Sequence, residues 1–176
     1  MLLTQWIRTL SVIHFIAFAS FFLVTTGAWA QARLAQPGVV TRVVDGDTVW
    51  VAASADGELL KLRLQGIDAP EICQPGGTEA RQALKRRVLG QRVMVVFAAH
   101  DQYGRTIGTL HLQGEDMGRW MVAQGHAWAY TYRHKKGPYA DELAQAQLAR
   151  RGVFSVHTAE EPRLFRKSHG SCYPRR

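Results

Sequence analysis

The stretch VVTRVVDGDTVWVAASADGELLKLRL, residues 39–64, predicts the centre of the fold. Three runs within it, 39–44, 48–53 and 59–64, are rich in β-branched residues or alternate apolar with charged residues, as strands do. An Asp-Gly pair lies in each gap between the runs, and Asp-Gly favours tight turns because both residues tolerate positive φ. The stretch therefore predicts a three-stranded meander.

Two more strands are expected downstream, at RVMVVFA (92–98) and TIGTLHL (106–112), with the loop AHDQYGR between them. That makes five strands in all. Five short strands with helices on the outside predict an α+β fold that is mainly β, a five-stranded Greek-key barrel of the OB type with three α-helices. The sequence contains no repeats and no internal linker.

The three helices are expected between and after these strands. They begin with Thr78 as a cap, after Asp116 and at Pro138, and they end at Gly90, at Gly125 and before Gly152. The side chains expected to face the core are Ala80, Ala83, Leu84 and Val88 in the first helix, Met117, Trp120 and Met121 in the second, and Leu143, Ala144 and Leu148 in the third. The tail after Phe154 is expected to be irregular and basic.

The first 30 residues are typical of a secretory signal. They contain one cation, no acid, an apolar middle and an Ala-x-Ala end, so cleavage is expected after Ala30. A retained membrane anchor is the alternative, and Ser11, His14 and Ser20 argue against it because they interrupt the apolar stretch. We therefore expect a secreted or periplasmic protein with no stable membrane association after cleavage.

Removal of the signal leaves 146 residues, enough for one domain with a hydrophobic core. The expected organisation is a signal peptide (1–30), a short extension (31–37), an OB-fold domain (38–155) and a basic tail (156–176). Of the 22 lysines and arginines only Arg8 lies in the signal, which leaves 21 cations against 14 acids and a formal charge of +7. This excess indicates either a polyanionic partner or a soluble basic surface without a specific partner, and composition does not decide between them.

Two cysteines, Cys73 and Cys172, follow the signal, and in an exported domain they would tend to pair. A bridge between them would tie the C-terminal tail to the loop after Glu71 and would contribute about 3 to 5 kcal/mol by closing a long loop. Two unpaired thiols are the alternative. A metal site built on cysteine or histidine is not indicated, because no other cysteine is present and the seven histidines form no pair at ligand spacing.

Four acids follow neighbouring strands of the predicted meander. Asp45 and Asp47 lie in the first turn, and Asp68 and Glu71 lie in the loop after the third strand. Because neighbouring strands bring those ends close, the four carboxylates would repel one another unless a cation is bound. Hard divalent cations take oxygen ligands, so Ca²⁺ or Mg²⁺ fits this group and zinc does not. For each acid taken alone, a turn residue or a surface acid is the alternative.

Four motifs, VVDGDTV, RLQGIDAPE, DQYGRTIG and AYTYR, occur in this order, and as a set they resemble the secreted staphylococcal-type thermonuclease family. The resemblance covers about residues 39–154 and implies an OB barrel with three helices. It also implies that Asp47 and Asp68 bind one Ca²⁺ together with the backbone carbonyl of Ala69. The catalytic residues that it implies are Arg63, Glu71 and Arg105, and the residues that contact the nucleotide are Tyr103, Tyr130 and Tyr132.

Phosphodiester hydrolysis suits this set chemically. A cation polarises a non-bridging phosphate oxygen, and planar guanidinium groups hold phosphate oxygens at two points. Glu71 can act as general base or orient the attacking water. The resemblance therefore implies a Ca²⁺-dependent, sugar-non-specific endonuclease that cleaves DNA and RNA and leaves 3′-phosphate ends. We also expect single strands to be the favoured substrate, and a monomer, since nothing in the sequence demands a larger assembly.

Other interpretations stay open on the sequence alone. Arg63 can be an outward strand residue, Arg105 a solvated loop cation, and Tyr130 and Tyr132 packing residues. An OB barrel can also bind single-stranded nucleic acid without cutting it. A third interpretation is an exported structural or adhesive domain that uses only its basic surface.

Overall fold

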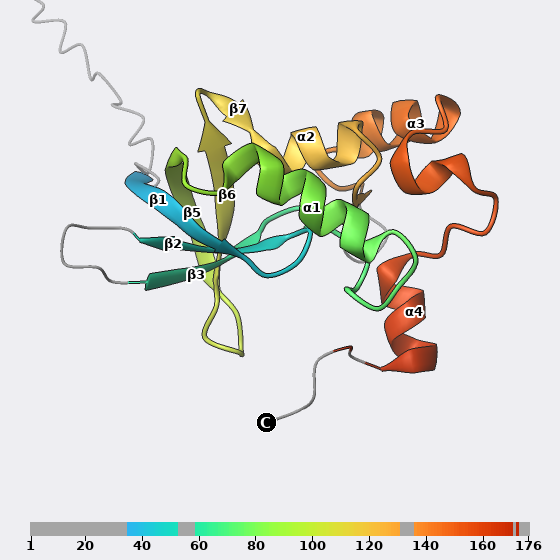
Figure 1. Cartoon of the computed structure of the whole chain (residues 1–176), viewed down its shortest axis with the longest axis horizontal. Coiled ribbons are helices and arrows are strands. Elements are labelled where there is room, and N and C mark those ends of the chain that lie inside the picture. Colours follow the sequence, from blue (N-terminus) through green and yellow to red (C-terminus); the bar gives the residue numbers. More distant parts are fainter. Residues whose placement is uncertain (1–34, 53–58, 131–135, 171, 173–176) are drawn as a thin grey trace, which may run out of the picture. The chain divides into compact units, whose positions relative to one another are not determined.

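The strands close into a barrel (Figure 1). The computed structural model describes residues 35–52, 59–130, 136–170 and 172. The long strands are β1 (Ala35–Val43), β2 (Thr48–Ala52), β3 (Leu59–Leu64), β5 (Arg92–His100) and β6 (Thr106–Leu112). β1, β2 and β3 form the predicted meander, β5 pairs antiparallel with both β1 and β6, and a parallel pairing of β3 with β6 closes the barrel. This architecture confirms the predicted OB-type α+β fold.

Three strands of two residues each add to the five that the sequence predicts. They are β4 (Ile67–Asp68), β7 (Glu115–Asp116) and β8 (Trp128–Ala129). β4 pairs with β8 outside the barrel sheet, and β7 pairs with the end of β6. Among the long strands, β1 begins at Ala35 rather than at 39, and β5 runs on to His100 instead of ending at 98. The second Asp-Gly turn lies outside the described residues.

Alternate side chains of the strands fill the barrel. Along β6, buried positions alternate with half-buried ones from Thr106 to Leu112. Side chains that are at most 2% exposed include Val40, Val49, Val51, Leu62, Leu64, Val95 and Leu110. Burial of each such side chain contributes about 1.5–3 kcal/mol, so the apolar alternation in the strands supplies the main driving force for closing the barrel.

The helix α1 (Gly77–Val88) packs against the barrel with the face that the sequence predicts. Its buried residues are Gly77, Ala80, Ala83, Leu84 and Val88. The predicted cap at Thr78 is wrong, because the N-cap is Gly76, two residues earlier, with φ of 88°. Gly77 lies against the backbone carbonyl of Glu71, where a Cβ would overlap the oxygen. Two glycines therefore turn the chain into the helix before Thr78 is reached.

The helix α2 (Met117–Ala123) begins where the sequence predicts. The Asp116 carboxylate accepts from the backbone N–H of Gly118 at 2.8 Å and of Arg119 at 3.2 Å, which caps the first turn. Met117 and Met121 are buried, and Trp120 is half-buried against the core. The Asp116 carboxylate also accepts from the hydroxyl of Tyr139 at 2.8 Å, which ties α2 to the start of the next helix.

The helix α3 (Ala140–Leu148) forms, but its inward face differs from the predicted one. Ala144 is exposed and Leu148 is 89% exposed, whereas Ala146 is fully buried. The face that meets the core is Tyr139, Leu143 and Ala146, spaced four and then three residues apart as one helix face requires. Of the three residues predicted to face the core, only Leu143 does so. The buried face continues from it to Tyr139 and Ala146, and not to Ala144 and Leu148.

The tail is not irregular, contrary to the prediction. The 3₁₀ helix η1 (Gly152–Ser155) runs into it, and the tail itself contains the helix α4 (Pro162–His169). Pro162 occupies the first turn of α4, where its missing N–H costs nothing, and Phe165 is 7% exposed. A helix of eight residues is marginal in water on its own, so contacts with the rest of the protein must hold it in place.

Residues 1–34 lie outside the described part of the chain, and the secretory signal and the domain boundaries stay predictions. Within the described residues, none of the helices has the length and apolar character needed to cross a membrane.

The contrast between Leu110 and Leu148 gives a test of this fold. We expect Leu110→Ala to lower the free energy of unfolding by about 2–5 kcal/mol, because it leaves a cavity in the barrel. The same substitution at Leu148 should change the free energy by less than about 0.5 kcal/mol, because that side chain is in water. Urea unfolding followed by circular dichroism measures both, and equal losses would contradict the assignment of these positions.

Candidate active site

The turn between β1 and β2 carries a buried carboxylate. Asp47 is 3% exposed, and its backbone N–H donates to the Asp45 carboxylate at 3.0 Å. The Asp47 carboxylate accepts from the Thr48 hydroxyl at 3.0 Å and from the Ala69 backbone N–H at 2.9 Å. The bond to Ala69 spans 22 residues of sequence, so it joins this turn to the loop after β4.

Gly46 allows the turn to lie directly against that loop. A Cβ at this position would lie 2.6 Å from the Cβ of Ala69 and 3.0 Å from the Cβ of Ala80. Neither neighbour is a flexible side chain that could move aside. The glycine of the Asp-Gly pair therefore permits close approach here, in addition to forming the turn.

Strand pairing brings two arginines to this end of the barrel. Arg63 of β3 is paired with Thr48 on one side and with Ile107 of β6 on the other. Arg105 precedes Ile107 by two residues. Closure of the barrel through β3 and β6 therefore places both predicted catalytic arginines near the Asp47 turn.

The Arg63 side chain connects two carboxylates from different segments. Its Nη1 forms an ion pair with Oδ1 of Asp47, and its Nη2 donates to Oδ1 of Asp68 at 3.0 Å. Burial lowers the pKa of Arg63, the charges of Asp68 and Asp45 oppose that effect, and the like charge of Arg105 adds to it. Because a guanidinium stays protonated in proteins, Arg63 supplies a permanent positive charge between the acids.

A second guanidinium reaches the same acids from α4. Arg166 donates to both oxygens of Asp68, at 3.1 and 2.8 Å, and to Oε1 of Glu71 at 2.9 Å. Burial alone lowers the pKa of Arg166, but its hydrogen bonds and ion pairs with the two carboxylates outweigh burial and raise the pKa. Asp68 is therefore held by two arginines, one from the barrel and one from the tail.

The loop that carries Glu71 is attached to the segment around α4 at both ends. Before the helix, the Gln74 side chain donates to the Glu160 carbonyl at 2.7 Å. After it, a disulfide joins Cys73 to Cys172, with Cα atoms 5.7 Å apart. Figure 1 shows α4 beside this loop, below the start of α1. The pair of cysteines that the sequence suggests thus lies next to the candidate site.

Arg105 acts on the cluster through its charge. Its Nε donates to the Asp101 carboxylate at 2.6 Å, and its backbone N–H donates to the same carboxylate at 2.9 Å. Burial raises the pKa of Asp45, while the positive charges of Arg63 and Arg105 lower it. Among the described residues, no hydrogen bond joins Arg105 to the acidic cluster; its guanidinium is held by Asp101 and affects the cluster through its charge.

The three predicted tyrosines are less closely placed. Tyr103 is 74% exposed, and the Arg105 guanidinium lies 5.5 Å from the centre of its ring. Tyr130 is 43% exposed, and its backbone N–H donates to the Gly66 carbonyl at 2.8 Å. Tyr132 lies outside the described residues. Both described tyrosines are exposed, and neither side chain has a described hydrogen bond to the acidic cluster.

The predicted metal ligands have suitable chemistry. Asp47, Asp68 and the Ala69 carbonyl offer only oxygen atoms, and hard cations such as Ca²⁺ prefer such donors. Within the described residues, no group of three or more His, Cys, Asp or Glu residues is arranged to hold a metal ion. With two carboxylates and one carbonyl, the protein would supply only part of the shell of such an ion, and water and substrate oxygens would complete it.

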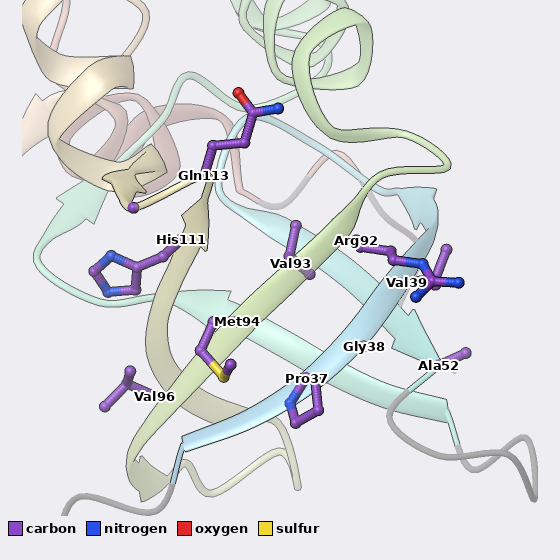
Figure 2. A pocket seen from close by; sticks show the side chains of 11 residues that line it. Pro37, Gly38, Val39, Ala52, Arg92, Val93, Met94, Val96, His111 and Gln113 are labelled. Atoms are coloured by element: carbon purple, nitrogen blue, oxygen red, sulfur yellow. The ribbon is translucent and has the colours of Figure 1, made fainter.

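A separate groove lies on the outer surface of the barrel and shares no residue with this cluster. Its volume is about 740 Å³, and it is lined largely by apolar residues of β1 and β5 together with residues around the end of β6, including Pro37, Met94 and His111 (Figure 2). Because its lining is largely apolar and contains none of the four acids, the groove is not part of the same site.

Arg166 is the site residue that sequence reasoning missed. The signal was present, because the suggested pairing of Cys73 with Cys172 would bring residue 166 close to the loop that carries Glu71. Pro162 followed by Phe165 also marks a helix start with one buried position. The basic, polar composition of the tail instead favoured the prediction of an irregular segment.

The close approach at Gly46 predicts a specific loss of stability. Gly46→Ala should lower the free energy of unfolding by about 1–3 kcal/mol, because the added methyl group forces the turn away from Ala69. Urea unfolding measures the loss, and a change in the Asp45–Asp47 amide resonances in NMR spectra locates it. An unchanged free energy would mean that the turn does not lie against the loop.

Comparison with known proteins identifies the family. The family model described as staphylococcal nuclease homologue matches residues 61–153. The chain is 33% identical to a micrococcal nuclease of Shigella flexneri over 170 residues, 90% of this chain and 94% of that protein. It is 34% identical to Protein ParB of Escherichia coli over 171 residues, 91% and 93% of the two chains, and 34% identical to an uncharacterized endonuclease of Escherichia coli O157:H7 over 131 residues, 73% and 84%. The chain therefore belongs to the staphylococcal nuclease family and is a nuclease of the hydrolase class.

Proposed function

We propose that this protein is an exported, Ca²⁺-dependent endonuclease that hydrolyses the phosphodiester bonds of DNA and RNA and leaves 3′-phosphate ends. The observation that carries the proposal is the position of Arg63, which joins Asp47 to Asp68 within one network that also reaches Glu71 through Arg166. Relatives named micrococcal nuclease and endonuclease support the same reaction. Single strands are the favoured substrate and the monomer is the acting form.

Asp47, Asp68 and the Ala69 carbonyl would hold the calcium ion. When bound, the ion supplies Lewis-acid polarisation of a phosphate oxygen. Extracellular proteins can use calcium sites with a Kd on the order of 10⁻⁴ to 10⁻³ M, because the ion is abundant there. Export, expected from residues 1–30, is therefore consistent with a site that has only two carboxylate ligands.

Two guanidinium groups stabilise the charge that develops on phosphate. Arg63 and Arg105 each present planar N–H groups, which bind phosphate oxygens at two points and bind more tightly as charge accumulates. The hydrogen bond to Asp101 orients the Arg105 side chain, and the pairing of β3 with β2 fixes the backbone of Arg63. Loss of one such donor commonly lowers kcat by about 10²–10³.

Glu71 serves as the general base. Its carboxylate takes a proton from the attacking water, whose oxygen forms a bond to phosphorus while the bond from phosphorus to the 5′ oxygen breaks. The released 5′ oxygen gains a proton, and the phosphate stays on the 3′ side. Glu71 is held near Asp68 by Arg166 in the structure, so the base and a metal ligand lie in one hydrogen-bond network.

A binding module without catalysis is the second candidate. OB barrels bind single strands through basic grooves and exposed aromatic rings, and Tyr103 and Tyr130 are both exposed. A module that only binds has no use for a half-buried Arg63 placed between two buried acids. The catalytic interpretation accounts for that feature and the binding interpretation does not.

Metal removal tests the proposed role of calcium. With a labelled single-stranded DNA, we expect cleavage in millimolar Ca²⁺ and a loss of at least about 10³-fold with excess EGTA, because the cation polarises phosphate. Asp47→Asn should show a similar loss in calcium. Asp141→Asn, an exposed acid of α3, is the matched control and should keep full activity. Cleavage that persists in EGTA, or a DNA that is retarded on a gel but never shortened, would reject the proposal.

Substitution of Arg63 tests the guanidinium. Arg63→Lys keeps the positive charge but loses the two-point contact, so kcat should fall by about 10²–10³. Lys61→Gln, on the same strand and exposed, is the control and should leave kcat unchanged. Steady-state kinetics give the ratio, and analysis of the product ends should show 3′-phosphate. A kcat within a factor of three of the wild type in Arg63→Lys would remove Arg63 from the reaction.

A further inference from the structure

Arg166 occupies oxygens that the proposed cation would need. It reaches Asp68 and Glu71 from 98 and 95 residues away in sequence. The Asp68 and Glu71 side chains are 6% and 17% exposed, whereas Arg166 is 34% exposed. The guanidinium therefore lies at the rim of the site and covers two acids that lie deeper.

The acceptor positions of Asp68 show how little space remains for a metal ion. An ionised carboxylate offers about four lone-pair positions. Arg63 uses one of those of Asp68, and Arg166 uses two. A calcium ion takes six to eight oxygen ligands, and Asp68 is one of only two carboxylates proposed to bind it. With Arg166 in place, Asp68 has a single position left to offer.

The positive charge of Arg166 also disfavours binding of a cation at Asp68. A divalent ion bound to Asp68 would lie beside a guanidinium that is within about 3 Å of the same oxygens, and like charges at such distances repel. Arg63 creates the same conflict, but it belongs to a barrel strand that is paired on both sides. Arg166 lies on a helix outside the sheet, so it is the guanidinium that can move.

The attachment of α4 keeps Arg166 close even when it moves. The Cys73–Cys172 disulfide and the bond from Gln74 to the Glu160 carbonyl fix both sides of the helix to the loop of Glu71. Such a tether gives the guanidinium a high effective concentration at the acids. A free cation must therefore compete with an intramolecular one.

We propose that Arg166 sets the cation affinity of this site by competing with the divalent ion for the Asp68 carboxylate, and that the disulfide maintains the competition. The inference rests on the proposed calcium site. It makes α4 a part of the site that determines the calcium concentration at which the cation is bound.

Calcium titration without nucleic acid tests the inference. Isothermal titration calorimetry at constant ionic strength should show that Arg166→Gln binds Ca²⁺ about tenfold more tightly than the wild type, equal to about 1.4 kcal/mol. A tenfold effect follows if Arg166 leaves Asp68 available in about one molecule in ten. Arg163 is an exposed residue of the same helix without a described ion pair, so Arg163→Gln removes the same charge and should leave the Kd unchanged.

A second variant separates the competition from damage to the fold. Cys73→Ser/Cys172→Ser keeps Arg166 but releases the tether, so its Kd should fall between those of the wild type and Arg166→Gln. Circular dichroism spectra and thermal melting of each variant, measured in EGTA, check that the barrel is intact. A Kd equal to that of the wild type in the double variant would overturn the role of the disulfide.

The failures of the two proposals can be told apart. An equal or weaker calcium affinity in Arg166→Gln, with wild-type calcium binding and calcium-dependent cleavage preserved, overturns the competition but leaves the nuclease proposal intact. No calcium binding by the wild type or by Arg166→Gln, with cleavage that continues in EGTA, overturns the calcium site and the competition together.

Discussion

The ion pair between the buried Asp47 and Arg63 is the interaction on which the rest of the site depends. Asp47 and Asp68 are 3% and 4% exposed, and a buried carboxylate without a partner is strongly destabilising. One guanidinium compensates both acids because its two terminal nitrogens face different carboxylates. The same contacts hold the β1–β2 turn next to β4. Loss of Arg63 would therefore leave the acids without a partner and would also loosen the packing at this end of the barrel.

Barrel closure is the condition under which that pairing can form. Arg63 lies on β3, and the parallel partner of β3 is β6, which follows the loop that carries Arg105. Without the β3–β6 pairing the two arginines would end different strands of an open sheet. Closing the sheet brings both positive charges to the end where the acids of the turn and the loop converge. A fold that buries apolar side chains thereby also concentrates opposite charges at one end.

The tail adds a partner that the barrel lacks. Arg63 alone cannot balance Asp47, Asp68 and Glu71, and Arg166 supplies the second guanidinium. The resulting contacts, with the disulfide and the buried Phe165, explain why a helix of only eight residues is held in place. At least one of the excess cations, Arg166, thus pairs with specific acids of the same protein. Composition alone could not distinguish this arrangement from a generally basic surface.

The sequence by itself determined the five long strands, the first three helices and the chemical groups of the site. Alternating apolar residues located the five long strands, and apolar residues three and four apart located the buried face of α1, because both signals depend on neighbouring residues. The resemblance carried by the four motifs pointed to Asp47, Arg63 and Asp68 as one group. The start of α1 at Gly77 rather than Thr78, the inward face of α3 and the contact of Arg166 with Asp68 were decided only by tertiary structure. In each case the deciding contact comes from a different segment of the chain, such as the Glu71 carbonyl behind Gly77, and a local pattern carries no information about where such a segment lies.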